Sequence, residues 1–312
     1  MSRTGTVAQL VESAGEPSLL MSRSDFVRRG FAAGDLVRVE SKRGGIFVPI
    51  RSSGEEGPGS VFLAMHWGSG SLGGDALCGV NALTSTLRCP ISQQPALKHA
   101  AVRVTKADLP WRLAAFGYPD DGDALRLRDA LRSLLEVLPY VSVTLMGRDS
   151  PGVLFRGAAP SAPDPSVLAR VDAAFGLDGD AVARYDDGTR GIGRRVRVAA
   201  DRLVGVRLSG DTSAETWLRE WLAGQDVSVL RSLLLLPAKD PPAGFAPRGR
   251  VVCTCFDTAE RELRTTLAAA GGSADAALRE VQASLKCGTN CGSCLPELRR
   301  LAAEAVVISA PV

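Results

Sequence analysis

The sequence lacks the features that mark membrane-spanning, secreted or nucleic-acid-binding proteins. No apolar run approaches the roughly 18 residues that a membrane-spanning helix needs, and one candidate, Leu233 to Pro237, is far shorter. The N-terminus has no signal-peptide core and no cleavage pattern. A formal charge of +3 is too small to indicate binding to nucleic acid or to a membrane surface. We therefore expect a cytoplasmic protein with no nucleic-acid and no membrane partner.

The cysteines are too unevenly placed for a disulfide framework. Five of the seven lie in the last fifth of the chain, a distribution typical of ligands that are kept reduced. The hydrophobic content of 45% and the charged content of 23% describe an ordinary globular protein, and 312 residues exceed what one core usually organises. We expect three domains, at residues 1–105, 106–248 and 249–312.

Four of the clustered cysteines form two tight pairs. A C-x-C motif at Cys253 and Cys255 is followed, after a gap of 35 residues, by a C-x-x-C motif at Cys291 and Cys294. Closely spaced thiolates repel one another unless a cation binds them, so the pattern indicates a metal or iron–sulfur site. Zinc ribbons usually carry two C-x-x-C motifs roughly 15 to 20 residues apart, and plant-type ferredoxins also differ from this arrangement. Zinc and unligated thiols stay open as alternatives.

A fifth cysteine, Cys287, completes a C-x-x-x-C-x-x-C motif with Cys291 and Cys294, which is the spacing of radical enzymes. Only 18 residues follow Cys294, too few to build the barrel of such an enzyme. We therefore expect Cys287 to be a spare thiol that can exchange with a ligand.

The clustered cysteines lie in a segment that the sequence predicts to be helical. Asp257 and Glu260 form a capping box, which predicts a helix that begins at Asp257 and ends at a Gly-Gly pair. Ser273 is expected to cap a second helix, and Pro296, just after Cys294, to begin a third. Backbone N–H groups at that third N-terminus would favour the negative charge of a thiolate-bound cluster. A module this small is expected to depend on its metal for stability.

The first 105 residues read as a β-rich domain. Residues 35–50 alternate apolar and polar side chains about a glycine turn and predict a hairpin, while 60–65 and 100–104 predict two further strands. Short strands with Gly and Pro loops suggest a small barrel. The long loop at 68–98 opens on G-x-G-x-x-G but lacks the following helix and acidic residue of a dinucleotide fold.

The middle region reads as α+β. Trp217 and Trp221 stand four residues apart on a predicted helix and are expected to pack in a core. The charge-dense and glycine-dense stretch Asp186–Arg195 predicts a solvated turn. The other predicted elements are a helix at 124–135, a strand at 141–146, a Pro-rich loop or boundary at 150–166, a hairpin at 194–208, a helix at 215–222 and a linker at 237–247.

From Val251 to about Leu301 the chain resembles the bacterioferritin-associated ferredoxin-like module. In that family the ligands of a [2Fe-2S] cluster follow C-x-C and then C-G-x-C after two helices, and here residues 286–294 (KCGTNCGSC) carry the second half. The resemblance implies a small all-α module in which a [2Fe-2S] cluster is held by Cys253, Cys255, Cys291 and Cys294.

The N-terminal region resembles the C-terminal cofactor-binding domain of molybdopterin-dependent nitrate reductases. The resemblance is carried by Gly34–Gly44, Met65–Trp67, Val80–Thr84 and Pro90–Lys98. It implies a double-psi β-barrel that holds molybdopterin guanine dinucleotide.

By position within that resemblance, Asn81 and Lys98 match residues that contact the cofactor, and His66 or Trp67 falls near the substrate. Ser2, Arg3 and Thr4 match the tail of a cofactor loop. An ammonium group suits a pyrophosphate and an amide suits a guanine edge. The alternative is that Asn81 only serves a turn and that Lys98 only lies on the surface.

A barrel, an α+β region and a [2Fe-2S] module in this order resemble the end of the catalytic subunit of bacterial assimilatory nitrate reductases. In that family the molybdenum ligand and the [4Fe-4S] site lie upstream, so we expect a fragment, a split subunit or a mispredicted start. The implied activity is nitrate reduction to nitrite, with the upstream polypeptide and an electron-donor reductase or ferredoxin as partners. We expect no catalytic residue in this chain and no turnover by it alone. The alternatives are a stand-alone electron-transfer or iron-handling module and a zinc-stabilised interaction protein.

Overall fold

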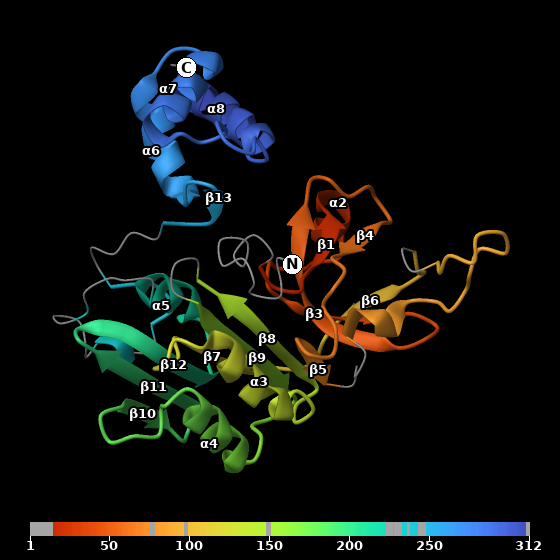
Figure 1. Ribbon diagram of the computed structural model, residues 1–312, viewed down its shortest axis with the longest axis vertical. Coiled ribbons are helices and arrows are strands. Elements are labelled where there is room, and N and C mark those ends of the chain that lie inside the picture. Colours follow the sequence, from red (N-terminus) through yellow and green to blue (C-terminus); the bar gives the residue numbers. More distant parts are fainter. Residues whose placement is uncertain are drawn as a thin grey trace. The chain divides into compact units, whose positions relative to one another are not determined.

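The chain is divided into two compact units, Met1–Asp240 and Pro241–Val312 (Figure 1). The computed structural model describes residues 15–74, 79–96, 99–147, 151–222, 227, 233–235, 238–242 and 248–309. No helix in this described part is long and apolar enough to cross a membrane. The three domains expected from the sequence stay a prediction.

The first sheet of the N-terminal unit contains five strands in the order β4-β1-β3-β2-β6. They are β1 (Leu19–Ser22), β2 (Leu36–Glu40), β3 (Gly45–Ser53), β4 (Val61–Leu63) and β6 (Arg103–Lys106). The predicted hairpin is confirmed as the antiparallel pair β2 and β3, in which Val37 faces Val48. Both side chains are fully buried, because alternate residues of each strand point to the core. The N-terminal region is therefore rich in sheet, and its described strands form an open sheet with β4 and β6 at the edges.

Two short helical segments accompany this sheet. Helix α2 (Arg23–Arg28) begins at Ser22, whose hydroxyl accepts a hydrogen bond from the backbone N–H of Asp25. The 3-10 helix η2 (Gly79–Leu83) buries Val80 and Leu83 against the sheet and carries Asn81 on its exposed side.

The second sheet contains seven antiparallel strands in the order β10-β11-β12-β7-β9-β8-β5. They are β5 (Leu72–Gly74), β7 (Trp111–Gly117), β8 (Tyr140–Met146), β9 (Gly152–Ala159), β10 (Ala183–Asp187), β11 (Ile192–Ala199) and β12 (Arg202–Gly210). Strand β5 comes from the long loop of the N-terminal region and pairs with β8, so Leu72 lies opposite Ser142. The loop thus ties the first 105 residues to the second sheet.

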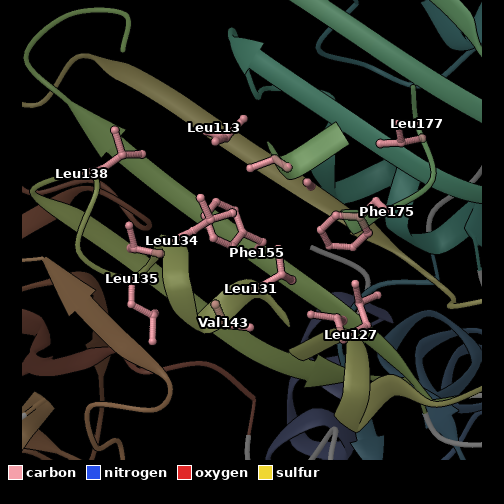
Figure 2. Close-up of a cluster of buried hydrophobic side chains, with 14 of the residues drawn as sticks. Leu113, Leu127, Leu131, Leu134, Leu135, Leu138, Val143, Phe155, Phe175 and Leu177 are labelled. Atoms are coloured by element: carbon pink, nitrogen blue, oxygen red, sulfur yellow. The ribbon is translucent and has the colours of Figure 1, made fainter. Parts of the chain in front are cut away.

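Figure 2 shows the core on one face of this sheet, where helices pack onto β7, β8 and β9. Leu127 of helix α3 (Ala124–Ala130) and Leu131 of the 3-10 helix η3 (Leu131–Leu134) meet Phe155 of β9 there. Helix α4 (Pro165–Ala174) adds Val171 to the same core. The predicted helix at 124–135 therefore exists, with its last turn tightened to a 3-10 helix.

The other face of the second sheet is also covered. Successive side chains of a strand point to opposite faces, so Ala114 and Phe116 of β7 point away from the core shown in Figure 2, and both are fully buried. Helix α5 (Glu215–Leu222) contacts β7 and β12. Trp217 and Trp221 are each 2% exposed and meet edge to face, with ring centroids 5.1 Å apart. Their prediction as core residues is confirmed.

Two predictions for the middle region were wrong. Residues 150–166 were expected to form a loop, but β9 lies inside the sheet between β7 and β8. The prolines stand around this strand and Pro165 begins α4, so no proline interrupts the ladder. Asp186–Arg195 was expected to be a solvated turn, but most of it belongs to β10 and β11, and Arg194 is completely buried. The Nη2 of Arg194 lies 3.6 Å from Oδ2 of Asp211, and this ion pair offsets part of the cost of burying the charge.

The C-terminal unit consists of a two-stranded sheet and three helices. These elements are β13 (Val251–Cys253), β14 (Thr258–Ala259), α6 (Glu260–Ala270), α7 (Ala274–Leu285) and α8 (Leu295–Ser309). The predicted cap of the second helix is confirmed, since the Ser273 hydroxyl accepts from the N–H of Ala276. The predicted capping box was wrong: α6 begins at Glu260, and Asp257 lies in a left-handed turn with φ +50°. The Asp257 carboxylate pairs with Arg248 and does not cap the helix: Nη1 of Arg248 lies 3.2 Å from Oδ2 of Asp257.

Candidate functional site

The five C-terminal cysteines come from two loops at one side of the helical core. Cys253 ends β13 and Cys255 lies in the turn that leads to β14, while the other three lie between α7 and α8. Both loops contribute to one buried cluster with Leu263, Leu267 and Leu298. The sequence separation of the C-x-C and C-x-x-C motifs is thus the length of two antiparallel helices.

The loop between α7 and α8 is held by backbone conformations that favour glycine. Lys286 ends α7 in the left-handed region, and Gly288 follows with φ +79°. A Cβ on Gly288 would lie 2.6 Å from Cδ2 of Leu295, so no larger residue fits there without movement. Gly292, with φ +74°, opens the last turn before α8. The two glycines therefore fix the directions in which the three thiols of this loop point.

The thiols separate into an outer pair and a buried group. The Sγ atoms of the outer pair, Cys255 and Cys291, lie 3.3 Å apart; Cys291 is exposed to solvent and Cys255 is half-buried. Cys253 is 2% exposed and Cys294 is 6% exposed, and their thiols are in hydrogen-bonding contact. Cys287 is fully buried beside Cys253. All five are free thiols, and the 3.3 Å in the outer pair is well beyond the ~2.05 Å of a disulfide bond.

The surroundings shift the thiol pKa values in opposite directions. The hydroxyl and backbone N–H of Ser293, followed by the Cys255 thiol, lower the pKa of Cys291 to about 7. Burial, followed by the neighbouring Cys253 thiol, raises the pKa of Cys294 to about 11. Burial also raises the pKa of Cys287 to about 12. A bound cation is what makes thiolates at such buried positions stable, because it replaces the lost solvation.

The arrangement fits a cluster of two irons. Two thiolates on one tetrahedral metal, with bonds of about 2.3 Å, lie roughly 3.7 Å apart, so the 3.3 Å between Cys255 and Cys291 needs little adjustment. The thiols of Cys253 and Cys294 form a second close pair. Two pairs of thiols, with one pair at each metal, are the ligand set that a dinuclear iron–sulfur cluster would use.

The N-terminal candidates fall into two groups. His66, in a turn after β4 with φ +73°, and Asn81 are both exposed. The residues next to them in the chain are joined, since the N–H of Val80 donates to the carbonyl of Trp67 at 2.9 Å. Trp67 itself is 3% exposed and belongs to the core, so of the pair at 66 and 67 only His66 faces solvent. The remaining candidates lie outside the described residues: Ser2, Arg3, Thr4 and Lys98.

The Asn81 backbone serves a turn, as the alternative interpretation expects. Its carbonyl accepts from both the N–H of Thr84, at 3.1 Å, and the hydroxyl of Thr84, at 2.9 Å. Its side chain is nevertheless exposed. Asn81 can therefore serve the turn through its backbone and still present its side-chain amide to a ligand.

Sequence analysis did not predict a set of buried ion pairs in the second sheet. Arg207 of β12 is 2% exposed and binds Asp172 of α4 through two bonds of 2.9 Å, from Nε to Oδ1 and from Nη2 to Oδ2. Arg156 of β9 is paired with both Glu16 and Glu215. These charges join helices to strands and are structural, since each is satisfied by a partner. An arginine at an alternating apolar position of a strand is the signal that could have identified them.

Comparison with known proteins defines the class of this chain. Residues 1–101 match the family described as Molydopterin dinucleotide binding domain, and residues 251–304 match the BFD-like [2Fe-2S] binding domain. The chain therefore combines a molybdopterin dinucleotide-binding domain with a [2Fe-2S]-binding domain, as expected from the resemblances, and both cofactors are supported. This combination supports an electron-transfer role of the molybdoenzyme type.

Two individual proteins are similar to this chain, and both are named nitrate reductases. The chain is 25% identical over 320 residues to a nitrate reductase of Klebsiella oxytoca, a match that covers 97% of this chain and 32% of that protein. It is 41% identical over 66 residues to a nitrate reductase of Synechocystis sp., which covers 21% of this chain and 9% of that protein. The resemblance to nitrate reductases is thus confirmed, and the chain spans about a third of the length of the Klebsiella relative.

Proposed function

We propose that this chain is the C-terminal portion of a molybdenum-dependent nitrate reductase that converts nitrate to nitrite in nitrate assimilation. In this role the N-terminal unit clamps one side of molybdopterin guanine dinucleotide, and the C-terminal module carries electrons. Its partners are the remaining part of the enzyme, on the same or a separate polypeptide, and an electron-donor reductase or ferredoxin. The proposal extends to this chain what the names of its relatives say of them.

The observation that carries the proposal is the placement of the cysteines on a chain that also contains the pterin-binding domain. We propose Cys253, Cys255, Cys291 and Cys294 as the four cluster ligands. We propose that an electron donor approaches at the outer pair, since Cys291 is exposed, Cys255 is half-buried and Phe256 beside them is 38% exposed. Burial of the other pair keeps water from half of the site.

Nitrate reduction consumes two electrons and two protons and releases nitrite and water, and the molybdenum cofactor supplies that chemistry when bound. The residues of this chain bind and orient. We propose that the amide of Asn81 recognises the guanine edge and that Lys98 faces the pyrophosphate, with Ser2, Arg3 and Thr4 beside it. His66, exposed next to the η2 turn, is proposed to lie near the substrate.

Two finer features of the fold belong to the same proposal. We propose that the first sheet is part of a double-psi barrel, which its parallel pair β1 and β3, flanked by antiparallel neighbours, supports. We also propose three domains with boundaries near residues 105 and 248. The N-terminal unit has one core that consists mostly of residues before 105 and another that consists of residues after it, which supports the first of these boundaries.

The decisive experiment joins the chain to the part of the enzyme that it does not contain. The chain is co-expressed with a polypeptide corresponding to the preceding two-thirds of the Klebsiella relative, and the purified complex is assayed for nitrate-dependent oxidation of a reduced dye. We expect activity in the complex and none in the chain alone. A complex that is loaded with molybdenum and iron but inactive toward nitrate would refute the proposal. It would favour a stand-alone electron-transfer or iron-handling module, which the separate compact C-terminal unit also suits.

A further inference from the structure

Cys287 is the one thiol of the C-terminal module that the proposed ligand set leaves unused. It is fully buried, more so than any of the four proposed ligands. Its position is fixed on both sides, because Lys286 ends α7 in the left-handed region and Gly288 has φ +79° with no room for a side chain. A thiol held this firmly has a defined set of neighbours.

Three groups surround the Cys287 thiol within hydrogen-bonding reach. The carbonyl oxygen of Leu285 lies 3.6 Å from its Sγ, and the side chains of Thr258 and Cys253 also contact it. The hydroxyl of Thr258 lies 3.3 Å from the carbonyl of Phe256 and can donate to it. The Cys253 sulfur is therefore a shared neighbour of Cys287 and Cys294.

We propose that Cys287 is not a ligand but a positioning residue, whose S–H donates a hydrogen bond to the Sγ of Cys253 and thereby raises the reduction potential of the cluster. The inference rests on the proposed ligand set. When Cys253 binds iron its sulfur is a thiolate, and a charged acceptor competes for the S–H proton better than the neutral carbonyl of Leu285 does. Cys287 is fully buried, so no water competes with Cys253 for its S–H group.

A hydrogen bond to a ligand sulfur stabilises the reduced cluster more than the oxidised one, because the reduced cluster carries the greater negative charge. Loss of the bond should therefore lower the potential. We expect Cys287→Ala to weaken the binding of the electron on the order of tenfold, which corresponds to about 59 mV for a one-electron couple. Cys287→Ser keeps a donor at the same position and should restore most of the difference.

The test uses the full chain, purified anaerobically as wild type, Cys287→Ala and Cys287→Ser. Iron and sulfide content is measured first, followed by a redox titration monitored by electron paramagnetic resonance. Wild-type protein exchanged into deuterated water should also lose a proton hyperfine coupling that the alanine variant never shows. This last measurement needs only the wild type if the alanine variant fails to fold.

Each outcome decides the proposal. Unchanged iron, a lower potential in Cys287→Ala and recovery in Cys287→Ser support it. An unchanged potential in the alanine variant, or no exchangeable coupling in the wild type, would overturn it while leaving the proposed function intact. Loss of iron from Cys287→Ala alone would show that Cys287 is a ligand. A wild-type chain that binds no iron would overturn both this inference and the proposed function beneath it.

Discussion

The buried pair of Asp172 and Arg207 offers a direct test of the physical account of the N-terminal unit. Arg207 is 2% exposed and Asp172 is 8% exposed, and two bonds of 2.9 Å join them. Replacement of Asp172 by asparagine keeps the shape but leaves the guanidinium without its counter-charge. Arg195, whose Nε lies 3.8 Å from the same carboxylate, loses part of its pairing as well.

Breaking a buried pair from one side typically costs about 3–5 kcal/mol, because an uncompensated charge stays in a low-dielectric interior. We therefore expect Asp172→Asn to lower the free energy of unfolding of this unit by about 3 kcal/mol. Asp129→Asn is the matched control: its partner Arg128 lies 2.9 Å away, but the Asp129 side chain is 51% exposed, so the expected loss is below about 1 kcal/mol.

Urea denaturation followed by tryptophan fluorescence measures these losses. All four tryptophans lie before residue 240, so the signal reports the N-terminal unit and not the cysteine-bearing module. A loss in Asp172→Asn no larger than in the control would refute the argument. Such a result would mean that water or a rearranged side chain solvates Arg207 in the variant.

Three further predictions follow from the same structure. Cys291→Ser should abolish cluster binding, measured as iron per chain and visible absorbance, whereas Ser293→Ala beside it should leave the iron bound. Gly288→Ala should reduce iron incorporation several-fold, because its Cβ would meet Leu295 at 2.6 Å and φ is +79°, whereas Gly179→Ala, in open space, should not. Burial alone would raise the pKa of Glu215, but Arg156 and then Arg219 outweigh it and hold the pKa below its ordinary value of 4.5. That stabilisation is present above pH 4.5 and is lost as the pH falls through the lower folded-state value, so Glu215→Gln should flatten the acid limb of stability measured by tryptophan fluorescence.

The sequence was most informative where spacing alone constrains geometry. The alternation in residues 35–50 predicted the β2 and β3 hairpin, and the Trp217 and Trp221 pair was recognised as core. The two cysteine motifs carried the resemblance to a [2Fe-2S]-binding module, which the family match to residues 251–304 confirms. The prediction of a loop or boundary at residues 150–166 was wrong, because it was based on proline content. The prolines stand on either side of β9 and do not interrupt it.

Other features depend on contacts that no local pattern records. Asp257 has the spacing of a helix cap, yet Arg248 nine positions earlier holds it in a turn, and α6 begins later. Arg194 looks like part of a solvated charge run until strand pairing buries it beside Asp211. Cys287 stood out in the sequence as an extra thiol, but its contact with Cys253 comes from the fold of two separate loops.

The most direct test of the central claim is the metal content of the full chain after anaerobic purification. If Cys253, Cys255, Cys291 and Cys294 hold a [2Fe-2S] cluster, the protein is coloured, contains two irons and two acid-labile sulfides per chain, and gives a paramagnetic signal when reduced by one electron. One zinc per chain, no sulfide and no visible absorbance would contradict the account.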